Sequence, residues 1–200
     1  MKLRIVALGD STTAGTPGFL SPLEAPPNGQ GNPESQYAYW MMKAHTDWVV
    51  LNRGIDGQRS DEIRARFVRD VIEPKPNYAI ILAGVNDIFQ QVPLEPIEKN
   101  LLFMYENSVS AKIKPVAATV LPYNTASDSE TKATRELNRW IESIAKHLRI
   151  LFCDTNGAVA DTRNPNRLRS SPDGYHPDVS GYRNMGKAIV RVIETDAASE

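Results

Sequence analysis

The 200-residue sequence has few of the features that mark disulfide-rich, nucleic-acid-binding or membrane proteins. Its single cysteine, Cys153, excludes an internal disulfide, and the apolar run before it predicts a buried strand cysteine rather than a reactive thiol. The formal net charge is −1 and no basic run with interleaved aromatic residues occurs, so nucleic acid is not an expected partner. No segment approaches the roughly 20 apolar residues of a membrane span, which argues against stable membrane insertion.

The first residues also lack the features of a signal peptide, which has a longer apolar segment and a small-residue cleavage site. The apolar stretch near the N-terminus is interrupted by Arg4 and ends at Gly9-Asp10. We therefore predict a first buried strand there and, by default, a cytoplasmic location.

Several ligand-binding motifs are missing as well. There is no P-loop GxxxxGK[ST], no GxGxxG after the first predicted strand, and no GxSxG turn of the ordinary α/β-hydrolases. No cluster of His, Cys, Asp and Glu has the spacing of a metal site, so neither a metal nor another cofactor is expected.

Short apolar runs alternate with amphipathic stretches along the whole chain, which we expect to form one domain over residues 1–200. Strands are predicted at residues 3–8, 48–52, 78–83, 115–121 and 150–154. Helices are predicted at residues 35–46, 61–72, 94–112, 128–148 and 180–194, the fourth beginning at a capping box formed by Ser127 and Glu130. This alternation predicts an α/β sandwich around a buried parallel sheet.

Small polar or ionisable residues follow three of these strands and precede the last helix. They occur in four segments: Gly9-Asp10-Ser11, Asn52 to Gly57, Gly84-Val85-Asn86-Asp87, and Asp173-Gly174-Tyr175-His176-Pro177. Ligand sites of open parallel sheets form outside the carboxyl ends of the strands, so we expect the four segments to converge at one edge.

The residue types in these segments fit acyl transfer. Ser11 is the candidate nucleophile, His176 the base that takes its proton, and Asp173 the carboxylate that orients the imidazole. The Ser11 and Gly54 N–H groups and the Asn86 side-chain amide are the candidate oxyanion-hole donors.

Together the four segments resemble the ordered sequence blocks of the SGNH (GDSL) hydrolase family. The resemblance covers nearly the whole chain and implies a flavodoxin-like, three-layer α/β/α sandwich with a five-stranded parallel sheet. It also implies a Ser-His-Asp hydrolase that acts on a small-molecule ester.

Each candidate also has a purely structural interpretation. Ser11 could cap a helix, Gly54 could serve a turn that needs positive φ, and Asn86 could hold its own loop. For Asp10 and Asp87 the structural interpretation is preferred: we expect buried carboxylates that brace the site through hydrogen bonds to backbone.

The substrate is less determined than the reaction. A carboxylic ester is the leading expectation, and a thioesterase, a lysophospholipase or an acetyl-carbohydrate esterase could use the same site. The Pro/Gly-rich segment from Thr16 to Pro33 and residues 90–93 are the candidates for shaping the pocket, whereas Arg163, Arg167 and Arg169 are expected at the solvated surface. A flavodoxin-like phosphate- or nucleotide-binding module is the alternative from another class, and a monomer is the default state.

Overall fold

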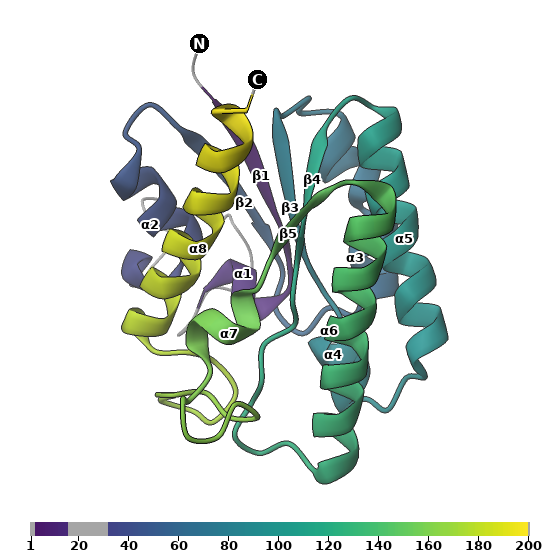
Figure 1. Ribbon diagram of the computed structural model, residues 1–200, viewed down its shortest axis with the longest axis vertical. Helices are drawn as coiled ribbons and strands as arrows, with labels where there is room; N and C mark the ends of the chain where they lie inside the picture. The colour runs from purple at the N-terminus through teal and green to yellow at the C-terminus, as the bar shows by residue number, and fades with distance from the viewer. Residues whose placement is uncertain (1–2, 16–31, 200) are drawn as a thin grey trace.

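The computed structural model describes residues 3–15 and 32–199 and contains a five-stranded parallel sheet between two layers of helices (Figure 1). The strand order is β2-β1-β3-β4-β5. The strands are β1 (Arg4–Gly9), β2 (Val49–Gly54), β3 (Tyr78–Leu82), β4 (Lys114–Ala118) and β5 (Leu151–Cys153). The expected α/β sandwich is confirmed, and its strand order is that of the flavodoxin-like folds.

Helices of different lengths connect the strands. They are α1 (Ser11–Ala14), the 3₁₀ turn η1 (Pro33–Ser35), α2 (Tyr37–Ala44), α3 (Ser60–Ala65), the π-helical turn η2 (Val68–Ile72), α4 (Val85–Phe89), α5 (Leu94–Ser110), α6 (Asp128–Leu148), α7 (Thr155–Val159) and α8 (Val179–Ala197). The predicted capping box of Ser127 and Glu130 starts α6, and Asp178 caps α8 through the Gly181 N–H.

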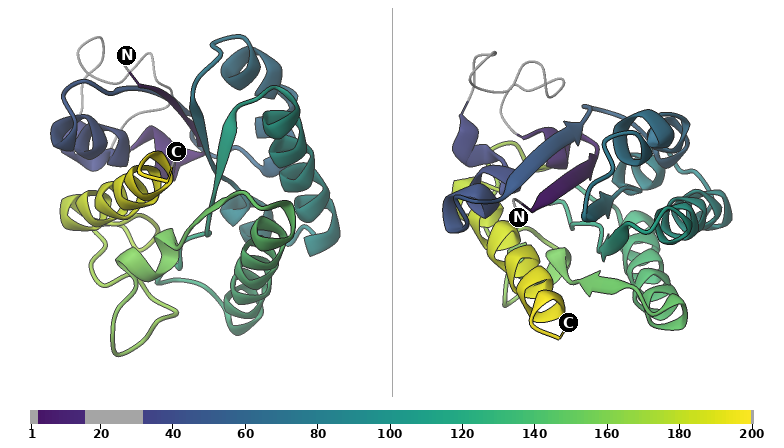
Figure 2. Two further views of the ribbon diagram at one scale, coloured as in Figure 1. Left: turned by 45° about the horizontal axis from the view of Figure 1, so that its top comes forward. Right: turned by 90° about the horizontal axis from the view of Figure 1, so that it is seen from above.

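The sheet is buried on both faces because side chains alternate along each strand. On β1, Ile5 and Ala7 pack into the core beneath α2 and α8, whereas Val6 and Leu8 pack into the opposite core beneath α3, α5 and α6. The view from above shows the two helical layers on opposite sides of the sheet (Figure 2). Cys153 lies in the first of these cores, and burial raises its thiol pKa to about 12, so it is the buried strand cysteine that was predicted.

Most predicted boundaries differ from the structure by one to three residues, and two of the differences have identifiable reasons. The fourth strand was expected to reach residue 121 but ends at Ala118, because the Asn138 side chain hydrogen-bonds both the N–H and the C=O of Val120. The helix expected over residues 61–72 changes after Ala65 to a π-helical turn, in which the Glu73 N–H donates to the Val68 carbonyl.

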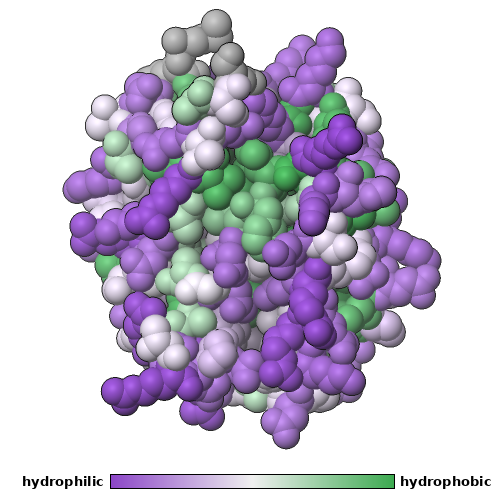
Figure 3. Space-filling model, in the orientation of Figure 1, coloured by the Kyte–Doolittle hydropathy of each residue, from purple (hydrophilic) through white to green (hydrophobic). Residues whose placement is uncertain are grey.

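The edge strand β5 borders an apolar surface between α6 and α8 (Figure 3). Half-buried Leu151 and Phe152 line a shallow hollow there together with Val192.

Within residues 3–15 and 32–199, no helix combines the length and apolar character that crossing a membrane requires. Most of the segment from Thr16 to Pro33 lies outside the described residues, so its expected part in the pocket stays a prediction.

Candidate functional site

The candidate nucleophile lies on a short helical turn at the carboxyl end of β1. Ser11 is the first residue of α1, and the buried Asp10 carboxylate caps this turn by accepting the Thr12 N–H at 2.9 Å. Asn52, near the end of β2, donates its side-chain amide to the Thr13 carbonyl at 2.8 Å. These two contacts fix the turn from both sides, and Asp10 lies as the sequence predicted, with its side chain bonded to backbone.

Asp10 is an unusual group for such a position because its side chain is almost fully buried. Burial raises the pKa of Asp10 to about 6, although the Thr12 N–H and the positive charge that His176 can carry both lower it. Ionising Asp10 in this buried position therefore costs free energy, which its hydrogen bond from the Thr12 N–H partly offsets.

Ser11, His176 and Asp173 form a continuous chain of hydrogen bonds. The Ser11 Oγ lies 2.8 Å from His176 Nε2, and His176 Nδ1 lies 2.7 Å from Asp173 Oδ2. Ser11 follows the end of β1, whereas Asp173 and His176 lie in the loop before α8. Ser11 and His176 are 165 positions apart in the chain. The structure thus brings together all three members that the sequence predicted.

Asp173 is held as an acceptor by its own turn. Its Oδ1 accepts the backbone N–H groups of Tyr175 and His176, each at 2.8 Å. Burial alone would raise the pKa of Asp173, but the hydrogen bonds from His176 and Tyr175 outweigh it and lower the pKa to about 2. An ionised carboxylate only accepts, so His176 carries its proton on Nδ1 and leaves Nε2 free to accept from Ser11.

Asn86 borders the same cavity from the first turn of α4. One hydrogen of its side-chain amide goes to the Gln58 carbonyl at 2.9 Å. An amide carries two hydrogens, so this bond orients the group and leaves one donor for a ligand. The loop contact and the oxyanion contact, which the sequence posed as alternatives, are compatible in this geometry.

Gly54 does not fit the donor role that the sequence suggested. Its N–H donates to the Asn52 Oδ1 at 2.9 Å, and a Cβ built on Gly54 would lie 2.0 Å from the Ala14 nitrogen. This glycine lets β2 approach the nucleophile turn closely, and its N–H is already used. The later glycine of the same loop, Gly57, is exposed with φ of +73°, and among the described residues no acceptor is found for its N–H.

A buried arginine that the sequence analysis missed connects the loops around the nucleophile. Arg66 donates to the Gly9 carbonyl, the Arg53 carbonyl and the Gln58 Oε1 at 2.7–2.8 Å, and it pairs with Asp70 at 2.7 Å. Burial lowers the pKa of this guanidinium, and Asp70 counteracts the shift. The signal available in the sequence was an arginine beside the apolar positions Ile63 and Phe67 of one helix.

Asp87 supports the site from a different direction. Its two carboxylate oxygens accept the N–H and the hydroxyl of Ser60, at 2.8 and 2.7 Å, where α3 begins. Burial raises the pKa of Asp87, and the bonds from Ser60 oppose that shift. Asp87 thus holds the start of α3, which follows directly after the loop that contains Gly57 and Gln58, and its bracing of the nucleophile turn stays a prediction.

A cavity of about 210 Å³ opens in front of Ser11. Apart from Ser11, Thr12, Asp56, Asn86 and His176, its lining is apolar or aromatic: Val85, Phe89, Leu121, Tyr123 and Tyr175. The expectation that residues 90–93 shape this pocket is wrong for the described cavity, since the neighbouring Phe89 lines it instead. Arg163, Arg167 and Arg169 are exposed, as expected.

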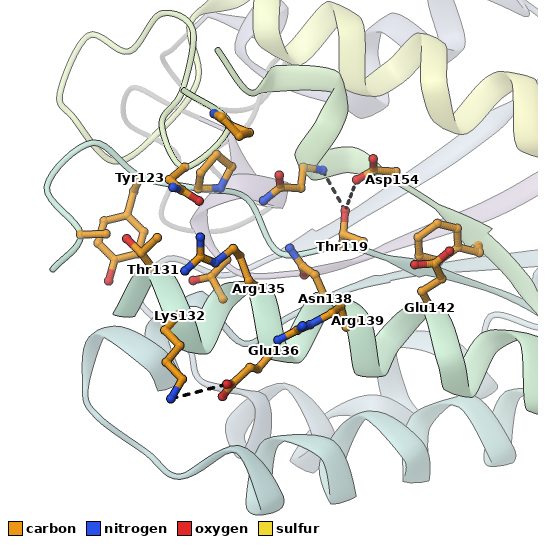
Figure 4. Close-up of a pocket in the computed structure, with 17 residues that line it drawn as sticks. Thr119, Tyr123, Thr131, Lys132, Arg135, Glu136, Asn138, Arg139, Glu142 and Asp154 are labelled. Carbon is orange, nitrogen blue, oxygen red and sulfur yellow. Dashed lines mark hydrogen bonds and ion pairs between the residues drawn. The ribbon is translucent and has the colours of Figure 1, made fainter. Parts of the chain in front are cut away.

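A larger groove of about 710 Å³ lies beside α6 and shares Tyr123 with the first cavity (Figure 4). It is lined mainly by polar side chains, including Lys132, Glu136 and Asp154, and several of them contact each other within the groove. Its lining contains neither Ser11 nor His176, so the smaller cavity is the candidate site.

Among the described residues, no group of three or more His, Cys, Asp or Glu side chains is placed to hold a metal ion.

Comparison with known proteins identifies the family of this chain. A sequence model of the GDSL-like lipase/acylhydrolase family matches residues 7–183. An acetylxylan esterase of Geobacillus stearothermophilus is 27% identical over 158 residues, covering 72% of this chain and 71% of the esterase. A Bacillus subtilis lipoprotein, YqeF, is 30% identical over 126 residues, which cover 59% of this chain and 48% of the lipoprotein.

Solved structures of esterases and lipases have the same fold as this chain. Axe2, an acetylxylan esterase from G. stearothermophilus, superposes with a TM-score of 0.77 and 25% identity, covering 96% of both chains. A GDSL-like lipase from Bacteroides thetaiotaomicron superposes with a TM-score of 0.76 and 26% identity, covering 98% of this chain and 89% of the lipase. Catalytic mutants of Axe2 that replace a serine, a histidine or an aspartate by alanine share the fold.

Proposed function

The chain belongs to the GDSL-like lipase/acylhydrolase family and is a carboxylic ester hydrolase, and we propose that it cleaves esters of short carboxylic acids through Ser11, His176 and Asp173. The observation that carries the proposal is the unbroken hydrogen-bond chain from Ser11 Oγ through His176 to Asp173. The family also argues against the phosphate- or nucleotide-binding module.

In the proposed reaction, Ser11 Oγ attacks the ester carbonyl carbon while its proton passes to His176 Nε2. The tetrahedral intermediate then expels the alcohol, which takes that proton and leaves an acyl group on Ser11. Water attacks the acyl-enzyme and gives a proton to Nε2. The free acid leaves as the proton returns to Ser11 Oγ. Asp173 orients the ring and stabilises the imidazolium at both stages.

The oxyanion of each tetrahedral intermediate needs donors that are already in place. We assign this role to the Ser11 N–H, to the Asn86 side-chain amide and to the Gly57 N–H in place of Gly54. The support for Gly57 is its position: its loop is tied to Asn86 by the Gln58 carbonyl and to Arg66 by the Gln58 side chain.

Asn86→Ala is expected to lower kcat by roughly 10²–10³-fold with a much smaller change in KM, because the lost donor acts on the transition state. Steady-state kinetics with p-nitrophenyl acetate measures both constants. Asn107→Ala on α5 is the matched control, and it should keep wild-type kinetics. An Asn86→Ala protein with wild-type kcat would contradict the assignment.

The size of the cavity favours short acyl groups. Its volume of about 210 Å³ is below the roughly 300–1,000 Å³ of sites that enclose drug-sized ligands, so this cavity fits a short acyl group better than a long acyl chain. This argues for acetyl and similar esters over a lysophospholipase. The acetylxylan esterases among the relatives support an acetyl-carbohydrate ester as the finer candidate.

The test is a series of p-nitrophenyl esters with acyl chains from acetate to dodecanoate. We expect kcat/KM to be highest for acetate or propionate and to fall steeply beyond butyrate. A maximum at octanoate or longer would refute the short-acyl proposal while leaving ester hydrolysis intact. Activity no higher than that of an inactive Ser11→Ala protein on every ester would refute the assigned site.

A further inference from the structure

Three aromatic rings from separate parts of the chain meet at the cavity in front of Ser11. Phe89 ends α4, Tyr123 follows β4, and Tyr175 precedes His176; we call them the aromatic cluster. The ring centroids lie 6.2–6.4 Å apart, with Phe89 edge-on to both tyrosines and the tyrosines nearly parallel. Such distances and angles are those of interacting aromatic pairs.

Two members of the cluster are exposed to solvent although they are large aromatic side chains. Phe89 is 53% exposed and Tyr175 is 45% exposed, whereas Tyr123 beneath them is 3% exposed. Among the described residues, Val68 and Val109 are the other large apolar side chains with such exposure, and neither lines this cavity. Exposed apolar surface beside a candidate active site marks a ligand-binding surface.

The chemistry of the proposed reaction places this surface on the alcohol side of the ester. The leaving oxygen takes its proton from His176 Nε2, so the alcohol must lie within hydrogen-bond reach of that atom. Tyr175 directly precedes His176, and Phe89 packs against Tyr175. The buried lining residues Leu121 and Tyr123 remain for the acyl group, which stays attached to Ser11 after the alcohol has left.

We propose that Phe89 and Tyr175 form a binding subsite for a six-membered ring carried by the alcohol of the ester. The inference rests on the proposed ester hydrolysis at Ser11 and adds the residues that select the alcohol. Aromatic faces are electron-rich and hold the C–H face of a pyranose or the edge of an aryl ring, while a short aliphatic alcohol covers little of either ring. The two ring chemistries share this surface.

The experiment keeps the acyl group constant and varies the alcohol. Acetate release is measured for ethyl acetate, phenyl acetate and methyl tri-O-acetyl-β-xylopyranoside. The variants are Phe89→Ala, Tyr175→Leu and the ring-preserving Tyr175→Phe, and Val109→Ala is the control for truncating an equally exposed side chain. The readout is kcat/KM for each ring ester divided by kcat/KM for ethyl acetate, which cancels general effects on the catalytic residues.

We expect Phe89→Ala and Tyr175→Leu to lower this ratio about 3- to 10-fold, mainly through KM, while Tyr175→Phe and Val109→Ala preserve it. A loss for phenyl acetate alone identifies an aryl alcohol, and a loss for the xyloside identifies a sugar. An unchanged ratio in folded, active Phe89→Ala and Tyr175→Leu proteins overturns the subsite. Wild-type protein inactive on all three esters is a failure of the proposed function instead.

Discussion

Ser11→Ala is expected to lower kcat for p-nitrophenyl acetate by about a millionfold, to the level that binding and the oxyanion donors sustain alone. The physical reason is that no other hydroxyl or thiol is placed 2.8 Å from His176 Nε2 among the described residues. Ser110→Ala, at an exposed position on α5, is the control and should have wild-type kinetics. Thermal unfolding of both variants shows whether the fold is kept.

The double variant tests whether Ser11 and His176 act as one unit. His176→Ala alone should cost nearly as much as Ser11→Ala, and the double variant should be no slower than either, because each loss already stops proton transfer from the nucleophile. Effects that multiply across the two sites would mean that the residues act independently. That result would contradict the hydrogen-bond chain as the carrier of activity.

The sequence predicts that the ends of β1, β2 and β3 meet around Ser11 because two strong rules act together. Continuous apolar runs identify strands buried on both faces, and parallel strands end at one edge of the sheet. The residues that follow β1, β2 and β3 therefore meet. His176 lies 165 positions from Ser11 and precedes α8 without directly following a strand, so its place at this edge is what the resemblance to the SGNH sequence blocks implies. Neither rule needs knowledge of side-chain packing.

The choice between Gly54 and Gly57 depends on a contact that those rules do not include. Asn52 Oδ1 accepts the Gly54 N–H, which is a local side-chain bond two residues away. Asparagine commonly makes such bonds, so this one could have been anticipated. We therefore propose Gly57 as the donor, because its N–H has no acceptor among the described residues.

Other features arise from partners that no local pattern reveals. Arg66 binds the Gly9 carbonyl 57 positions away, and Asn138 ends β4 from 18 positions away. The aromatic cluster joins three loops, and each of its rings alone looks like an ordinary core or surface residue. Such long-range contacts depend on the packed structure and not on periodicity or spacing.

Asp173→Asn is the sharpest test of the third proposed member, because it keeps the shape of the side chain and removes its charge. An amide can donate to His176 Nδ1, which favours the tautomer with the proton on Nε2 and so blocks acceptance from Ser11. We expect kcat at neutral pH to fall by roughly 10⁴-fold with little change in KM.

Measuring kcat of Asp173→Asn over a range of pH shows whether Asp173 acts by orienting the His176 ring. Hydrogen bonds lower the pKa of Asp173 to about 2, so the wild-type carboxylate stays ionised throughout the usual assay range and adds no titration of its own above about pH 3. The stability that this carboxylate adds is present above its unfolded pKa of about 3.9 and is lost as the pH falls through about 2. Asp161→Asn, in the preceding loop, is the control. If Asp173→Asn keeps near-wild-type kcat from pH 6 to 9, the imidazole is oriented by another group, and Asp173 serves the turn before α8 instead.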